Sequence, residues 1–219
     1  MAITVADMLT SIAYRRGEAG SPDNATEQAR RIRFLNEAYR AVMLKNYYWF
    51  AVKTLTDDTV ASQETYTLPS DYREMIEVRV DDLARYPMPA SEAFDFYRYP
   101  PIAFTYKYDY DNKYYYIFGS ELHLIPEPSA AGTDNLQLRY YYWPTALTTT
   151  SDTVIIPDQY TEALVAYAFA RLAHLRGKRG DASDGFEEFN ELVREMNKEN
   201  MRRNVWGKAV TPGDFKYSG

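Results

Sequence analysis

The chain has 219 residues, a formal net charge of −6 and a sequence pI near 5.1. This acidic balance argues against binding nucleic acid over the whole surface, which needs a basic footprint. The chain has no cysteine, which excludes disulfide frameworks, thiolate metal sites and a cysteine nucleophile. No apolar run approaches the 18 or more residues of a membrane span, and the first residues do not resemble a signal peptide.

The first helix is predicted to begin after Thr4. Thr4 and Asp7 have the spacing of a capping box, with Asp in place of the usual Glu. Gly17 is a natural stop for this helix. The apolar residues that share one helical face are Val5, Met8, Leu9 and Ile12.

A second helix is predicted from about Ala25 to about Asn46, after a turn over residues 20–24. The charged residues Arg30, Arg31, Arg33, Glu37 and Arg40 lie mainly off its apolar stripe. That stripe comprises Ile32, Leu35, Tyr39, Val42 and Met43.

Residues 47–150 are predicted to form strands, because Tyr, Thr, Val and Ile become frequent and turn residues recur at short intervals. Gly119 and Ser120 separate two β-rich runs and predict a tight hairpin, in which Gly supplies the positive φ. A short helix is expected near residues 91–97. The predicted strands cover residues 49–55, 64–67, 75–80, 103–108, 114–118, 121–125 and 135–143.

Two more helices are predicted near the C-terminal end. The first begins behind Pro157, which is tolerated in a first turn, and stops at Gly177. The second covers about residues 181–205, and residues 206–219 form an extended arm. The expected fold class is α+β. Residues 1–46 and 151–205 would pack as one helical bundle, and residues 47–150 would form an inserted antiparallel β-sandwich or barrel.

No catalytic constellation is found. The chain has no glycine-rich phosphate loop, G-x-S-x-G or H-E-x-x-H motif. We interpret His123, inside a predicted strand, and His174, near a helix C-terminus, as structural. A distant carboxylate pair stays open, but adjacent carboxylates point apart and do not form a dyad. We therefore predict no enzyme activity, no catalytic residue, no metal site and no cofactor.

The tyrosines are the most unusual local feature, since Tyr supplies 21 residues. Tyr106, Tyr108 and Tyr110 alternate along one segment and share a face if it is extended, with Tyr114 following. Three interpretations remain open: a sandwich core with its rim, an interface with another subunit or a tail protein, and a platform on which sugars or single-stranded nucleic acid stack. The nucleic-acid version is weak, because two aspartates offset the two lysines of this segment.

The C-terminal arm has a different charge balance. From Lys198 onward, basic residues outnumber acidic ones by three, although the whole protein is acidic. Such an arm, with apolar anchors, could fold when it binds a partner, and the alternative is an end without a role. The residues predicted to carry partner binding are Arg202, Arg203, Val205, Trp206, Lys208, Phe215, Lys216 and Tyr217.

Three stretches together resemble the head-to-tail adaptor proteins of tailed phages, including the tail tubular A type of short-tailed phages. They are LPSDYREMIEVRV, YYYIFGSELHLIPEPSAAGTDNLQLRYYYWPTAL and IIPDQYTEALVAYAFARLAHLRGKRGDASDGFEEFNELVREM, over residues 68–80, 114–147 and 155–196. Their order and the helix–β–helix plan cover most of the chain. No single motif among them is diagnostic, because these are signatures of a fold without invariant chemistry.

The resemblance implies a structural virion protein at the head-to-tail junction, made in the host bacterial cytoplasm. Such proteins form a homo-oligomeric ring, usually of twelve copies, under the portal protein. The ring continues the DNA channel toward the tail. The bundle would make the ring, the arm would reach the portal, and the β insert would face a tail (nozzle or tube) protein. An acidic channel wall would let DNA pass without specific binding.

A carbohydrate-binding virion protein is the alternative from another class. It would use the tyrosine-rich β insert as its platform. It predicts that the isolated insert binds glycans and that Tyr106→Ala or Tyr108→Ala abolishes this binding.

Overall fold

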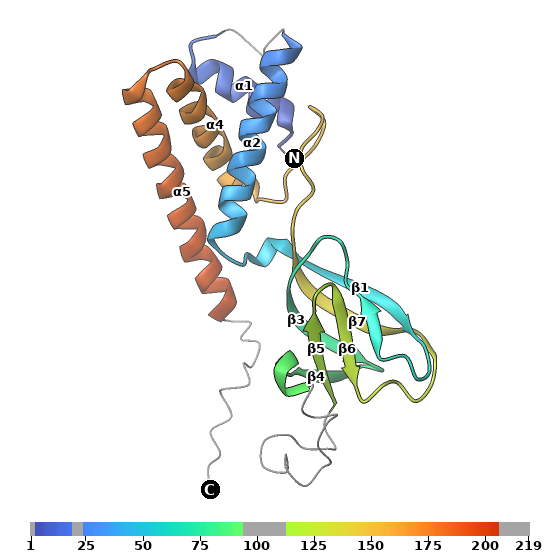
Figure 1. Cartoon of the computed structure of the whole chain (residues 1–219). Helices are drawn as coiled ribbons and strands as arrows, with labels where there is room; N and C mark the ends of the chain where they lie inside the picture. The colour runs from blue at the N-terminus through green and yellow to red at the C-terminus, as the bar shows by residue number, and fades with distance from the viewer. Residues whose placement is uncertain (1–2, 19–23, 94–112, 206–219) are drawn as a thin grey trace, which may run out of the picture. The chain divides into compact units, whose positions relative to one another are not determined.

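The computed structural model describes residues 3–18, 24–93 and 113–205 (Figure 1). The chain divides into two compact units. The helical unit contains the described residues of Met1–Ala51 and Pro144–Gly219, and the sheet unit contains those of Val52–Trp143. The prediction of a mixed α and β protein is confirmed. No helix in the described ranges is long and apolar enough to cross a membrane.

The helical unit is arranged around α4 (Thr161–Leu175), which packs against all three of its long neighbours. These are α1 (Val5–Arg15), α2 (Ala25–Lys45) and α5 (Arg179–Val205). Two short 3₁₀ helices, η1 (Trp49–Ala51) and η3 (Asp158–Tyr160), complete the unit. Because α4 is contacted from several sides, apolar residues cover most of its circumference. The buried ones are Ala163, Leu164, Val165, Ala166, Ala168, Ala170, Leu172 and Ala173.

Small residues allow α4 and α5 to pack closely against each other. A Cβ added to Gly185 of α5 would lie 3.0 Å from the Cβ of Ala170 and 3.1 Å from the carbonyl oxygen of Ala166. Any larger residue at position 185 must therefore push the two helices apart. The alanines of α4 and the glycine of α5 form one packing feature.

The N-terminal prediction is confirmed. The hydroxyl of Thr4 accepts a hydrogen bond from the backbone N–H of Asp7, and the Asp7 carboxylate accepts one from the N–H of Thr4. The helix ends at Arg15, and Gly17, in the turn that follows, has a φ of +70°. All members of the predicted apolar face are buried: Val5, Met8, Leu9 and Ile12.

The second helix has the predicted extent, but the placement of Arg31 off the buried face was wrong. Arg31 is 1% exposed, and its guanidinium donates to Glu18 at 2.6 Å. A second carboxylate, Glu27, lies 3.6 Å from it. Hydrophobic periodicity predicts that an arginine lies on the surface. It cannot show that the turn after α1 brings the carboxylate of Glu18 to the guanidinium of Arg31.

The sheet unit is one curled seven-stranded sheet in the order β1-β7-β3-β4-β5-β6-β2. Its inner face encloses a core built from strands that are distant in this order, so the sheet must bend around it. The core residues are Tyr66, Leu68, Val78, Val80, Tyr115, Leu122, Leu124, Leu136, Leu138 and Tyr140. The strands are β1 (Val52–Thr59), β2 (Thr65–Thr67), β3 (Tyr72–Val80), β4 (Leu83–Pro87), β5 (Tyr114–Phe118), β6 (Glu121–Ile125) and β7 (Gly132–Tyr142).

The hairpin between β5 and β6 is confirmed, with Gly119 at φ +62°. Strand β4 was missed. It follows a turn in which Asp81 and Asp82 both take positive φ, a conformation that sequence signals usually assign to Asn-Gly or Asp-Gly. The antiparallel prediction is corrected at one pair, because β4 and β5 run parallel. The sandwich or barrel is not confirmed by this single sheet.

Two sequence predictions lie partly or wholly outside the described residues. The strand predicted over residues 103–108 is one of them. Of the helix predicted near residues 91–97, the described part shows that residues 90–93 are helical.

The α4–α5 contact predicts opposite effects for two glycines of α5. Gly180→Ala, with no atom near the added Cβ, should raise the free energy of unfolding by up to about 1 kcal/mol, because alanine favours a helix. Gly185→Val should lower it by about 1–3 kcal/mol through overpacking. Urea unfolding followed by circular dichroism measures both. Equal effects at the two positions would contradict the close contact.

Candidate functional site

The C-terminal end of α5 is fixed to the segment that follows α2. The side-chain oxygen of Asn200 accepts from the N–H of Trp49 at 3.1 Å, and its amide donates to the carbonyl of Tyr47 at 2.8 Å. Asn197 accepts from the hydroxyl of Tyr48 at 2.9 Å and from the amide of Asn46 at 3.3 Å. Asn200 is 1% exposed, so its two hydrogen bonds join two segments of the chain where little water reaches them.

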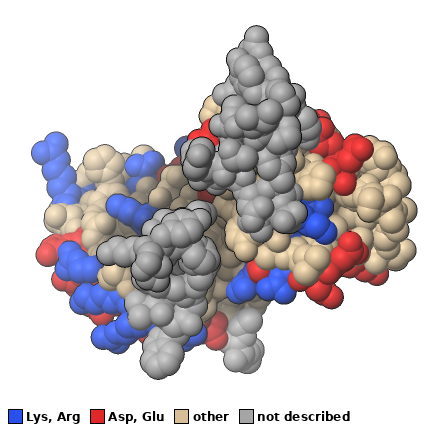
Figure 2. All heavy atoms as spheres, turned by 90° about the horizontal axis from the view of Figure 1, so that it is seen from below, with Lys and Arg blue, Asp and Glu red and all other residues tan. Residues whose placement is uncertain are grey.

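The basic residues predicted for the arm begin on this fixed end. Arg203 donates to Glu199 at 2.8 Å, and its guanidinium lies 4.5 Å from the centroid of the Trp49 ring. Arg202 is exposed one position earlier. Seen from below, basic side chains gather on the side where α5 lies (Figure 2). Val205 is the last helical residue. The remaining predicted arm residues, Trp206, Lys208, Phe215, Lys216 and Tyr217, lie outside the described residues.

The four predicted interface tyrosines are not brought together by the described structure. Tyr106, Tyr108 and Tyr110 lie outside the described residues. Tyr114 is buried in β5, where it packs in a small core with Met88 and Ile125. The interface role of these tyrosines stays a prediction, and the described structure places Tyr114 in the core of the sheet unit.

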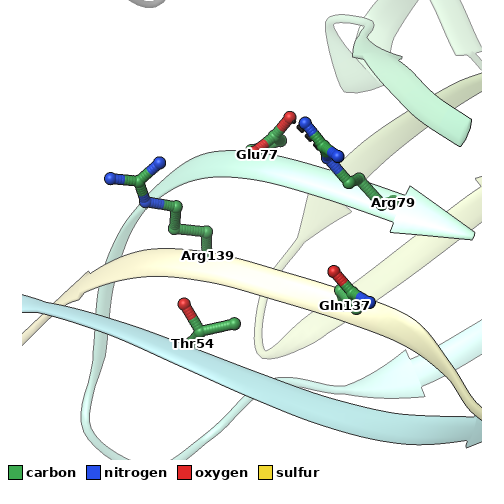
Figure 3. Close-up of a pocket in the computed structure, with 5 residues that line it drawn as sticks. All are labelled: Thr54, Glu77, Arg79, Gln137 and Arg139. Atoms are coloured by element: carbon green, nitrogen blue, oxygen red, sulfur yellow. Dashed lines mark hydrogen bonds and ion pairs between the residues drawn. The ribbon is translucent and has the colours of Figure 1, made fainter. Parts of the chain in front are cut away.

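A polar depression of about 240 Å³ lies on the solvent-facing side of β1, β7 and β3 (Figure 3). Arg139 of β7 is flanked in register by Thr54 of β1 and Glu77 of β3. Arg79, next to Gln137, donates to Glu77 at 2.7 Å. Within the part of the chain that the structure describes, the guanidinium of Arg139 makes no hydrogen bond or ion pair. A planar guanidinium exposed in this way is suited to donate hydrogen bonds to a carboxylate of another molecule.

The sequence did not reveal this depression. Thr54, Glu77 and Arg139 are separated by long stretches of chain, and only the strand order β1-β7-β3 makes them neighbours. Alternation along β7 was the available signal, since Gln137 and Arg139 alternate with the buried Leu136, Leu138 and Tyr140.

His123 has partners that sequence spacing did not show. Its Nδ1 lies 3.2 Å from both the Glu64 carboxylate and the Thr65 hydroxyl, and its ring stacks on Tyr116. Burial, together with the nearby Glu64, raises the pKa of Tyr116 to about 12. Across the described ranges, no group of three or more His, Asp or Glu side chains could hold a metal ion. We interpret His123 as part of a polar network that joins β2, β5 and β6.

The comparisons with known proteins identify the class. A family model described as SU10 adaptor protein matches residues 3–213, which is nearly the whole chain. The chain therefore belongs to the SU10 adaptor family, and the resemblance to phage head-to-tail adaptor proteins is confirmed. Membership of this family indicates that the protein is a structural component of a phage particle and that it contacts other virion components, such as the portal and the tail. No curated protein matches the chain.

The asparagine contacts predict a clear stability difference along α5. Asn200→Leu should lower the free energy of unfolding of the protein by about 1–3 kcal/mol, because the N–H of Trp49 and the carbonyl of Tyr47 lose this partner. Asn190→Leu, at an exposed position of the same helix, should stay within about 0.5 kcal/mol of the unchanged protein. Guanidinium unfolding measures both. If Asn200→Leu were neutral, the buried contact would not hold the end of α5.

Proposed function

We propose that the protein is a ring-forming head-to-tail adaptor, which joins the portal to the tail and continues the DNA channel. The observation that carries the proposal is the family match over residues 3–213. Twelve copies are the number that the resemblance implies. The helical unit would make the ring, since its long helices α2 and α5 carry exposed charged faces.

The portal contact is assigned to the C-terminal arm. Residues 206–219 follow directly on α5, whose last turns are held by Asn197 and Asn200. A rigid base of this kind lowers the entropic cost of placing the segment that follows it on a partner. Arg202 and Arg203 would begin the basic, aromatic segment that continues through Trp206 to Tyr217.

The sheet unit is assigned to the tail side. The depression around Arg139 offers an exposed guanidinium to a carboxylate of a tail (nozzle or tube) protein. The protein has a net charge of −6, and this acidic balance suits a channel through which DNA passes without specific binding. No observation on the described residues favours the carbohydrate-binding alternative.

Co-sedimentation with portal rings of the same phage tests this function. The full chain should sediment with the portal rings in a fixed stoichiometry. A chain that ends at Asn204 should lose most of this binding, because it lacks the arm. A variant with Arg139→Glu, which changes the sheet unit only, is the matched control and should bind the portal as the unchanged chain does.

One result would contradict the whole proposal, and another would contradict the role of the arm alone. If neither the full chain nor the truncated chain sediments with intact portal rings, the protein is not a portal-bound adaptor. If both sediment equally well, the adaptor role stands but the arm is not the portal contact.

A further inference from the structure

The outward face of α2 is basic. Arg33 and Arg40 lie on the side of the helix opposite the buried Phe34, Leu35 and Ala38. Arg33 is 74% exposed at its side chain and shares Glu37 with Arg171 of α4. Among the described residues, Arg40 forms no ion pair or hydrogen bond. One carboxylate serves two guanidiniums and a third guanidinium has none, so the face keeps an excess of positive charge.

The outward face of α5 is acidic over its first half. Asp184, Glu187 and Glu191 are exposed and follow one another at helical spacing, opposite the buried Phe189 and Val193. Within the described ranges, none of these three carboxylates has an ion pair or a hydrogen bond. Farther along the helix the pattern changes, since Glu195 is paired with Lys198 at 2.6 Å.

These two faces cannot neutralise each other within one chain. Helix α4 packs against both α2 and α5, and it lies between them in Figure 1. The basic face of α2 and the acidic face of α5 therefore both point away from α4. Each face is open to a partner from another molecule, and the two faces carry opposite charge.

The charged residues of the two faces also lie at matching positions along the helix axes. Helices α2 and α5 run in the same direction in Figure 1, and the Asn46 amide donates to Asn197 at 3.3 Å, which marks a common level. Arg40 and Glu191 each precede this level by six residues. Arg33 and Asp184 each precede it by thirteen. With about 1.5 Å of rise per residue, each arginine lies level with a carboxylate.

Rotation about a ring axis preserves height along that axis. If the axis runs along these helices, rotation places α2 of one copy beside α5 of the next at the same level. From the matched charges and heights, we propose that the subunit contact of the ring is heterologous. In this contact Arg33 meets Asp184 of the neighbouring copy, and Arg40 meets its Glu191. The exposed Leu44, at the end of the basic face, adds an apolar contact. This inference rests on the proposed function and names the surface that builds its ring.

Cysteine cross-linking tests the contact directly, because the chain has no cysteine of its own. The variant with Arg40→Cys and Glu191→Cys is assembled on portal rings and oxidised. On a non-reducing gel it should give a ladder of multimers, since each copy links to two different neighbours. Arg40→Cys alone and Glu191→Cys alone should stay monomeric. The matched control, Arg40→Cys with Lys198→Cys, pairs positions at different heights and should give no ladder.

Charge reversal gives a second reading at the same positions. Arg40→Glu alone and Glu191→Arg alone should each reduce the ring bound to the portal by at least about fivefold. The two changes together should restore it to within about twofold of the unchanged chain.

The outcomes separate this contact from the function itself. If the chain binds portal rings but the paired cysteines give no ladder, the proposed contact is wrong while the adaptor role stands. Dimers from Arg40→Cys alone would also overturn it, because they would show α2 against α2. If the unchanged chain does not bind the portal at all, the proposed function fails and this inference with it.

Discussion

The helical unit depends on the close packing of α4 against its neighbours. Small residues make this possible: Gly185 of α5 approaches Ala166 and Ala170 so closely that a Cβ has little space. Because α4 occupies the centre, α1, α2 and α5 each bury one face against it and turn the opposite face outward. The interior of this unit is mainly apolar, although Arg31 and Asn200 are buried in it. Among the described residues, the unpaired side chains of Arg40 and Glu191 lie on the outward faces of α2 and α5.

The two units together present several surfaces that suit contacts with other proteins. The end of α5 is held by the buried Asn200 and the partly buried Asn197, so residues 206–219 follow a fixed helix end. The sheet unit has its own core and offers a polar depression around Arg139. Each feature suits binding between proteins: a charged helix face, a fixed helix end and an exposed guanidinium. The chain belongs to a family of phage adaptor proteins, and we propose that these surfaces make its contacts in the phage particle.

Local signals in the sequence predicted local structure well. The capping box at Thr4, the stop at Gly17 and the Gly119 hairpin were all found, because each depends on neighbouring residues. Features that depend on distant parts of the chain were missed. Arg31 is buried because Glu18 meets it, His123 contacts Glu64, and Arg139 gains its neighbours from the strand order. Strand β4 was not predicted, because Asp81 and Asp82 form the turn before it without a glycine.

We propose that copies of this chain form a closed ring between the portal and the tail, through the faces of α2 and α5. Electron cryomicroscopy of portal rings saturated with the full chain tests it most directly. We expect a closed ring of the chain on one face of the portal, in which α2 of each copy lies beside α5 of the next. Isolated copies around the portal, or a ring in which α2 and α5 both face solvent, would contradict it.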